Sequence, residues 1–353
     1  MPEVGRRPRA RRWASVAAVN LLTLAVMLVA ADWGARRLCH AEFEALFSRR
    51  ARPLLGDLPV EPHPRRGTAL KPGYRDDLYR VNADGFRGAE LPPDLDRYRL
   101  IAAIGDSTTF GWGVGEGEDY PSRLMERLRR SGLPDVYVVS AGVPGYTSSQ
   151  TLAYSRELLA GPLGVDLVVA SVLWNDVWYS TVAEWHPSLL LGQPPAAWRR
   201  WLRDHSGLYR CFAVSRAARS DQVDVFNAPA FDLYRSNVEE MARLARRQGT
   251  RLILLEPPFD GDRMPKDGLN RFHIRYTRSF FIDLAHRHLD AVAEVAERHG
   301  VPVVPHRLSI DSRSRRDLFL DTLHPNAQGN DLMAEDVAAF LIENHVLEDL
   351  EVR

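Results

Sequence analysis

Short apolar runs alternate with amphipathic stretches through most of the chain after residue 97. Five runs have the length of a strand and lie at 97–105, 135–142, 165–176, 250–258 and 301–307. The segments between them repeat apolar positions at helical spacing, which predicts helices over 120–132, 147–161, 231–249 and 277–300 and a last helix from about Asn326. Strands that are apolar throughout are typical of a parallel sheet covered on both faces. The pattern therefore predicts an α/β fold, with a parallel sheet of about five strands between two layers of helices.

One longer apolar stretch lies near the amino terminus. Five arginines within 6–12 precede residues 13–33, which carry no charge before Asp32. About 19 apolar residues, each rising about 1.5 Å, span roughly 28 Å, close to the hydrocarbon core of a bilayer. The positive-inside rule then leaves residues 1–12 as a cytoplasmic basic tail and places everything after Asp32 outside. We expect a transmembrane anchor at 13–33. A signal peptide cleaved after Val29-Ala30-Ala31 and a buried soluble helix are the alternatives.

Composition changes abruptly around the predicted α/β domain. Residues 34–96 are rich in proline and turn residues, which predicts a stalk and a lead-in before a domain at 97–353. The alternation of predicted strands and helices is interrupted at about 177–230, which indicates an insertion. Five of the eight tryptophans lie at 174–201: Trp174, Trp178, Trp185, Trp198 and Trp201. Such rings either line a substrate site or pack the insertion and touch a membrane interface.

Charge and cysteine content exclude several functions. A formal net charge of zero argues against nucleic-acid binding. Cys39 and Cys211 are too few for a disulfide framework or a tetrahedral zinc site. The sequence has no HExxH-type pair, and we interpret His286 and His288 as surface residues of a helix. We therefore expect neither a metal nor a cofactor.

A candidate nucleophile follows the first strand. Gly105-Asp106-Ser107 ends the apolar run, and near the other end of the chain His324 stands three residues after Asp321. A serine hydroxyl needs a base within hydrogen-bond reach, imidazole suits that task, and a carboxylate can orient the imidazole. We expect Asp106 to brace the loop. The alternatives are a helix N-cap for Ser107 and a structural hydrogen bond between Asp321 and His324.

Two further residues follow the second and third strands. Parallel strands present their carboxyl ends at one edge, where ligands bind. Gly142 has no side chain to keep a ligand from its N–H, and Asn175 offers a carboxamide donor. Together with the Ser107 N–H they would form a three-donor oxyanion site. An ordinary turn glycine and a turn-forming asparagine are the alternatives.

Ser107, Gly142, Asn175 and His324, in this order, resemble the four motif residues of the SGNH or GDSL hydrolases, over roughly 97–345. The resemblance implies a flavodoxin-like sheet, acyl hydrolysis or transfer without a metal, and the roles given above. The segment YRVNADGFRG resembles the lead-in of membrane-anchored bacterial members. Two residues depart from the family: Ser140 replaces a usual asparagine, and Leu173 replaces a frequent glycine.

These observations predict a membrane-tethered serine esterase whose catalytic domain is periplasmic or extracellular. The expected substrate is an ester, such as an O-acyl group of an envelope glycan or of a lipid. An O-acyltransferase with the same triad is the first alternative, and a non-catalytic glycan-binding module on the hydrolase fold is the second. The expected partners are the substrate and, through the N-terminal helix, the membrane; the oligomeric state is left open.

Overall fold

The computed structural model describes residues 7–38, 59–182, 198, 201–202, 205–209, 211–212, 223–269, 275–348 and 350. Internal contacts divide the chain into two compact units. The larger unit comprises Asp57–Gly192 and Gln222–Arg353, and the smaller comprises Met1–Gly56 and Gln193–Asp221. Part of the predicted insertion, including Trp185, lies outside the described residues.

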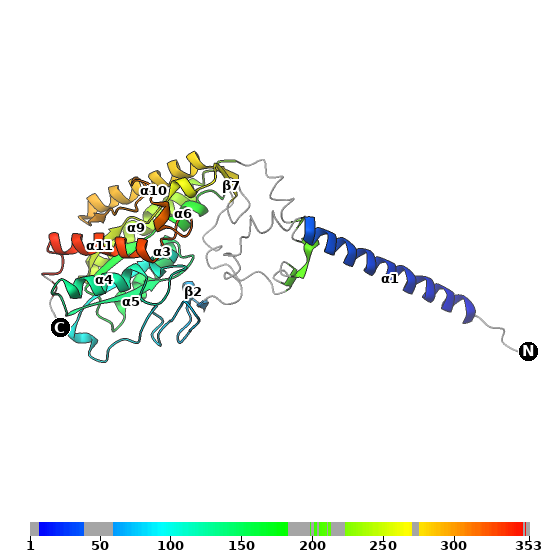
Figure 1. Ribbon diagram of the computed structural model, residues 1–353, viewed down its shortest axis with the longest axis horizontal. Coiled ribbons are helices and arrows are strands. Elements are labelled where there is room, and N and C mark those ends of the chain that lie inside the picture. Colours follow the sequence, from blue (N-terminus) through cyan, green and yellow to red (C-terminus); the bar gives the residue numbers. More distant parts are fainter. Residues whose placement is uncertain are drawn as a thin grey trace, which may run out of the picture. The chain divides into compact units, whose positions relative to one another are not determined.

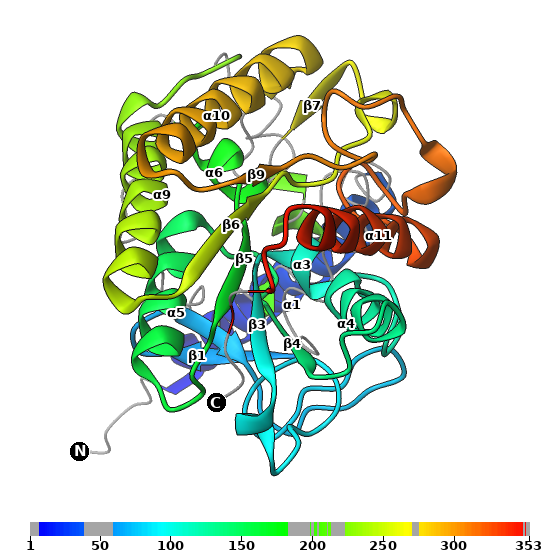
Figure 2. The same ribbon diagram turned by 90° about the vertical axis from the view of Figure 1, so that its left-hand side faces the viewer.

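A parallel five-stranded sheet forms the centre of the larger unit, as predicted, and its order is β4-β3-β5-β6-β9. Its strands are β3 (Arg99–Gly105), β4 (Val136–Gly142), β5 (Leu167–Ser171), β6 (Arg251–Leu255) and β9 (Val303–Val304). Of the five strands in this sheet, β3 comes first along the chain, and it lies between β4 and β5. Figure 2 shows the strands side by side, with helices on either side of them.

Alternation along the strands separates the core into two layers. Leu100, Ala102 and Ile104 of β3 pack in one buried cluster, and Ile101 and Ala103 pack in the other. The first cluster includes residues of α5 (Ser148–Ala160), α9 (Ala228–Gln248) and α10 (Arg278–His299), and the second includes residues of α4 (Tyr120–Arg130) and α11 (Ala327–Glu343). Both faces of the sheet are therefore covered, which explains why its strands are apolar throughout.

Local signals start and end these helices close to the predicted residues. Asn326 caps α11 through its side chain, which accepts from the Gly329 N–H. Gly249 and Gly300 end α9 and α10 in the left-handed conformation. The third strand is shorter than predicted, since β5 stops at Ser171 and residues 174–179 form the helix α6 (Trp174–Tyr179).

The segment before the sheet is more ordered than a stalk. Two short strands, β1 (Val60–His63) and β2 (Gly67–Leu70), pair as an antiparallel hairpin. After the hairpin, Val81 and Phe86 are buried in the same cluster as α5 and α9. The sequence did not predict this hairpin, because four-residue strands in a segment rich in proline and turn residues carry almost no periodic signal.

The smaller unit contains the N-terminal helix α1 (Arg7–Leu38), shown in blue in Figure 1. Within it, Ser15–Leu38 is long and apolar enough to cross a membrane, and the same test is passed by a signal sequence. Cys211 is disulfide-bonded, and the sequence contains one other cysteine, Cys39. The cysteine content argued against a disulfide framework and predicted nothing about a single disulfide.

Candidate active site

The sheet register brings the three predicted loops to one edge. Gly105, the last residue of β3, pairs with Gly142 on one side and with Ser171 on the other. Ser107 and Asn175 follow these positions directly, in α3 (Ser107–Phe110) and α6. Neighbouring parallel strands thus place the candidate nucleophile and the candidate oxyanion donors together, as the sequence pattern indicated.

Asp106 fixes the turn that carries Ser107. Its Oδ1 accepts hydrogen bonds from the Thr108 N–H and the Thr108 hydroxyl, both at 2.8 Å. Asp106 is therefore the N-cap of α3, and Ser107 is the first helical residue. The alternative that Ser107 acts as a helix N-cap is thereby wrong. Burial raises the pKa of the Asp106 carboxyl, and the bonds from Thr108 work against that shift.

The Ser107 hydroxyl meets an imidazole from the other end of the chain. Ser107 Oγ lies 2.9 Å from His324 Nε2, and His324 Nδ1 lies 2.9 Å from both carboxylate oxygens of Asp321. Since the carboxylate only accepts, Nδ1–H donates to Asp321 and Nε2 is left to accept the serine proton. Burial alone would raise the pKa of Asp321, but its hydrogen bonds with the His324 side chain and with two backbone N–H groups hold that pKa well below the usual value.

The loop that carries Asp321 and His324 is held at several points. The Leu320 N–H donates to the His324 carbonyl at 2.8 Å, which closes the loop. Asp321 Oδ1 also accepts from the N–H groups of Leu323 and His324, at 2.9 and 3.0 Å. A neighbouring segment contributes the Asp260 N–H, which donates to the Thr322 carbonyl at 2.8 Å. The three-residue spacing of the pair is therefore a turn built around the carboxylate.

The predicted oxyanion residues, Asn175 and Gly142, lie at the same edge of the sheet and differ in their contacts. The Nδ2 group of Asn175 donates to Asp106 Oδ2 at 3.2 Å and to the Tyr146 carbonyl at 3.0 Å, so both of its hydrogens are engaged. A Cβ at Gly142 would lie 2.3 Å from the Phe110 nitrogen. The glycine is therefore needed because α3 packs directly on the end of β4.

Asp176, which follows Asn175, was not singled out by the sequence analysis. Its carboxylate accepts from the Ser148 N–H at 2.8 Å and from the Ser148 hydroxyl at 2.7 Å, and so links α6 to the start of α5. Burial raises the pKa of Asp176 to about 7, while the bonds from Ser148 oppose the shift. This link holds the second and third loops of the site to each other.

Arg87 of the lead-in was also missed, although it lies in the quoted segment YRVNADGFRG. Its buried guanidinium donates to four carbonyl oxygens, those of Phe110, Gly111, Val114 and Gly115. Arg87 Nε also lies 3.5 Å from Asp119 Oδ2, and both side chains are 1% exposed. Arg87 thus anchors the chain that leaves the nucleophile helix.

Aromatic residues near the site divide into two groups. Trp112 is half-buried, with its ring centre 6.5 Å from that of His324. Trp174 is buried, donates from its indole N–H to the Pro258 carbonyl at 3.0 Å, and stacks on Phe259. Trp178 contacts Tyr276 and Phe281. Trp174 and Trp178 therefore pack within the domain, whereas Trp112, which the sequence pattern did not indicate, lies beside the imidazole.

His286 and His288, two histidines of the predicted helix at 277–300, have hydrogen-bond partners of their own. His286 is exposed and lies 2.9 Å from Asp311, as expected of a surface residue. The interpretation of His288 as a surface residue is wrong, because it is fully buried between Ser180 and the Leu284 carbonyl. Among the residues that the structure describes, no group of His, Cys, Asp and Glu is arranged to hold a metal ion.

Ser140 and Leu173, the two residues that depart from the family pattern, each make contacts that support the loops of the site. The Ser140 carbonyl accepts from the Arg87 N–H at 3.0 Å, so the lead-in joins the edge of β4 at this residue. Leu173 is buried in the core and precedes the first turn of α6. Ser140 is therefore held by a backbone hydrogen bond, and Leu173 by apolar packing.

Comparisons with known proteins identify one family and several similar solved structures. The family described as "GDSL-like Lipase/Acylhydrolase family" matches residues 103–332. Similar solved structures include the esterase EstA from Pseudoalteromonas sp. (14% identity, 70% of this chain and 98% of that chain, TM-score 0.44) and a GDSL-like lipase from Bacteroides thetaiotaomicron (17% identity, 72% and 93%, TM-score 0.42). A putative lipolytic protein from Desulfitobacterium hafniense has 14% identity over 68% and 98%, with a TM-score of 0.41. No curated protein matches the sequence.

Proposed function

Because the chain belongs to the GDSL-like lipase/acylhydrolase family and is a serine ester hydrolase of that family, we propose that it is a membrane-tethered esterase that works through Ser107, His324 and Asp321. The observation that carries the proposal is the contact of 2.9 Å between Ser107 Oγ and His324 Nε2. Nucleophile and base are already within the reach that proton transfer requires. No rearrangement of the loops is needed to begin the reaction.

The proposed reaction has two halves. Ser107 Oγ attacks the ester carbonyl while its proton passes to His324 Nε2, and the imidazolium then gives that proton to the leaving alcohol. Water attacks the acyl-enzyme in the second half and loses its proton to His324, which passes that proton to Ser107 Oγ as the bond between Ser107 and the acyl group breaks and the acid is released. Asp321 keeps the imidazole in the required tautomer and stabilises the imidazolium that forms in each half.

The oxyanion would be held by the N–H groups of Ser107 and Gly142 and by the Asn175 carboxamide. In the structure Asn175 Nδ2 has two acceptors, and the contact with Asp106 is the longer at 3.2 Å. An oxyanion would therefore compete with Asp106 for one Nδ2 hydrogen, while the Tyr146 carbonyl keeps the amide oriented. Asp106 is a positioning residue in this proposal, because it prepares Asn175 without touching the substrate.

We place the catalytic domain outside the cytoplasm. The five arginines within 6–12, which precede the apolar stretch of α1, favour that orientation, and a disulfide-bonded Cys211 fits an oxidising compartment. There, an O-acylated envelope glycan or a lipid ester is the expected substrate. An O-acyltransferase would use the same residues and differ only in accepting a sugar hydroxyl in place of water.

Labelling of the nucleophile tests this proposal. We expect a fluorophosphonate to modify Ser107 in the wild type, and labelling to slow by several orders of magnitude in His324→Ala. His286→Ala, which removes an exposed histidine with its own carboxylate partner, is the matched control and should label as the wild type does. Modification of another serine, or a rate indifferent to His324, would contradict the proposed triad. Product analysis with and without a sugar acceptor then separates hydrolysis from transfer.

A further inference from the structure

Large apolar side chains are exposed on part of the insertion that belongs to the smaller unit. We call the described residues between 198 and 212 the juxtamembrane segment. Its exposed side chains are Trp198 (56% exposed), Trp201 (59%), Leu208 (39%) and Phe212 (63%). Soluble surfaces seldom gather large apolar side chains in this way unless they meet a partner.

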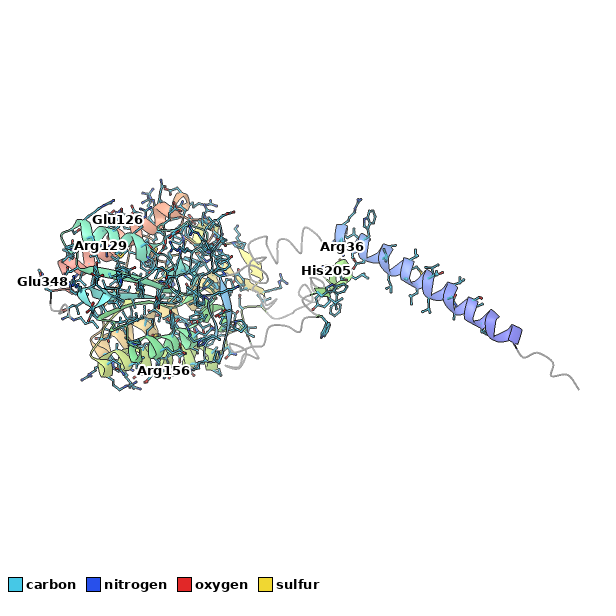
Figure 3. The ribbon with its side chains drawn as sticks, turned by 90° about the horizontal axis from the view of Figure 1, so that it is seen from below. Arg36, Glu126, Arg129, Arg156, His205 and Glu348 are labelled. Atoms are coloured by element: carbon cyan, nitrogen blue, oxygen red, sulfur yellow. The ribbon has the colours of Figure 1, made fainter. Side chains whose placement is uncertain are left out.

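The segment is fixed to the last turns of α1. Asp32 Oδ1 accepts from the Ser206 hydroxyl at 2.7 Å and from the Leu208 N–H at 3.1 Å. Its other oxygen accepts from Arg36 Nε at 2.9 Å. Figure 3 shows Arg36 and His205 at this same end of the helix. The first acidic residue after the apolar stretch thus serves as the attachment point.

Gly207 shows that the approach of the two backbones is close. A Cβ at this position would lie 2.4 Å from the Asp32 carbonyl oxygen and 2.6 Å from the Arg36 nitrogen. Both obstacles are backbone atoms of α1, so no side-chain movement could relieve the overlap. The sequence therefore provides the one residue type that lets the segment lie against the helix.

This attachment sets the depth of the segment in a membrane. The guanidinium carbon of Arg37 lies over the Trp33 ring of α1, 4.1 Å from the centre of that ring. Trp and Arg residues are typical of the membrane–water interface. The segment is attached one residue away, at Asp32. Residues 193–221 also contain six arginines and only two aspartates. Tryptophans combined with an excess of arginine are typical of segments that lie in the interface of anionic bilayers.

We propose that the juxtamembrane segment is a second membrane contact, which lies in the outer-leaflet interface beside the end of α1. Trp198, Trp201, Leu208 and Phe212 would enter the boundary between headgroups and acyl chains, and the arginine-rich composition of 193–221 would favour an anionic bilayer. The inference rests on the membrane tether proposed above. It gives part of the insertion a role in lipid binding, separate from the ester chemistry at Ser107.

Tryptophan quenching in lipid nanodiscs tests the proposal with the full chain. The wild type and the double variant Trp198→Phe/Trp201→Phe are placed in discs of phosphatidylcholine with and without phosphatidylglycerol, and the difference in fluorescence isolates the two rings. We expect lipids brominated near the headgroup to quench this difference signal, acrylamide to quench it little, and phosphatidylglycerol to increase the lipid quenching. Gly207→Ala should reduce the lipid quenching, because it separates the segment from α1.

Controls separate this inference from the tether itself. Trp13→Phe, near the other end of the apolar stretch, isolates a ring that reports on α1 alone. If Trp13 is quenched by lipid while the Trp198 and Trp201 signal is quenched only by acrylamide, the inference is overturned and the tether stands. Protection of that signal from both quenchers would show that protein covers the segment, which also overturns it. Absence of lipid quenching at Trp13 overturns the tether and the inference together. Fluorophosphonate labelling of Ser107 checks that each variant is folded.

Discussion

The proposed chemistry depends on one carboxylate whose protonation would disable the base. Asp321 receives hydrogen bonds from His324 and from two backbone N–H groups, which hold its pKa well below the usual value. The side chain is also a third exposed, so solvent shares its stabilisation. Asp321 therefore stays ionised throughout the neutral and mildly acidic range, where it continues to accept the hydrogen bond from His324 Nδ1–H.

Replacing this carboxylate tests its proposed role. In Asp321→Asn the amide can donate to Nδ1, so the proton moves to Nε2 and His324 can no longer accept from Ser107. We expect kcat to fall by about 10³–10⁴-fold with KM little changed, as orienting carboxylates of such triads behave. Steady-state hydrolysis of a soluble aryl ester measures both constants. A fall of less than tenfold would show that Asp321 only supports the loop.

Asn175 offers a second test of the site at the level of one side chain. Truncation in Asn175→Ala removes a proposed oxyanion donor but leaves Ser107 and His324 in contact. We expect kcat to fall by about 10²–10³-fold. Asp106→Asn should lower kcat less, because the Asn175 carboxamide keeps its bond to the Tyr146 carbonyl. Equal losses in the two variants would contradict the positioning role given to Asp106.

At the scale of elements, the nucleophile helix α3 is too short to hold itself in place. It is capped by Asp106 at its start, packed on Gly142 along one side, and anchored by Arg87 where the chain leaves it. These contacts come from three separate parts of the sequence. The geometry of Ser107 is therefore a property of the assembled edge of the sheet.

Arg87 is expected to act on both stability and rate. Arg87→Met removes the partner of buried Asp119 and leaves several carbonyls without a donor, so unfolding free energy should fall by about 3–5 kcal/mol. Arg87→Lys keeps a charge but cannot reproduce the forked contacts, and we expect an intermediate stability. Urea denaturation measures the first effect. At a temperature where both variants are folded, the rate of fluorophosphonate labelling should still be reduced. An unchanged rate would limit Arg87 to a stabilising role.

The contact between α3 and β4 allows a sterically defined test. In Gly142→Ala the new Cβ would meet the Phe110 backbone, so α3 must shift and the labelling rate of Ser107 should fall by at least about tenfold, as small misplacements near reacting groups do. Gly115→Ala is the matched control, because its nearest neighbour is the flexible Glu118 carboxylate at 3.2 Å. Similar rates in both variants would contradict the close packing.

Elements with a local signal could be predicted, and elements defined by distant contacts could not. Apolar runs and caps indicated the sheet, its covering helices and the start of α11 at Asn326. The hairpin of β1 and β2 lies within the predicted stalk, and α6 lies where the end of a strand was predicted. Ser107, Asp321 and His324 could be predicted as a candidate site because a serine after a buried strand, and an aspartate three residues before a histidine, are chemically suited to nucleophilic catalysis. Arg87 and Asp176 were missed because their roles depend on partners from other parts of the chain.

For the whole molecule, buried ionisable groups have opposing effects on the free energy of unfolding as pH changes. Burial lowers the pKa of His288 and of His306 to about 4, and raises that of Asp176 to about 7. Below about pH 6.5 the unfolded chain protonates its histidines while the folded chain does not, so both histidines cost stability as pH falls towards 4. Asp176 has the opposite effect, because the folded chain keeps a proton that the unfolded chain releases above about pH 4.

The two effects predict the stability of the larger unit and of one variant. Each group contributes up to about 1.4 kcal/mol per pH unit between pH 4.5 and 6, and the histidines make unfolding free energy rise with pH while Asp176, like Asp106, makes it fall. Asp176→Asn removes one opposing group and should make the slope of unfolding free energy against pH more positive by up to about 1.4 kcal/mol per unit, with its largest advantage over the wild type at pH 8. Urea denaturation of the full chain in detergent, followed at pH 4.5, 6 and 8, measures the slopes. Parallel curves for the two proteins would mean that the folded chain holds Asp176 ionised, and the bonds from Ser148 would then outweigh its burial.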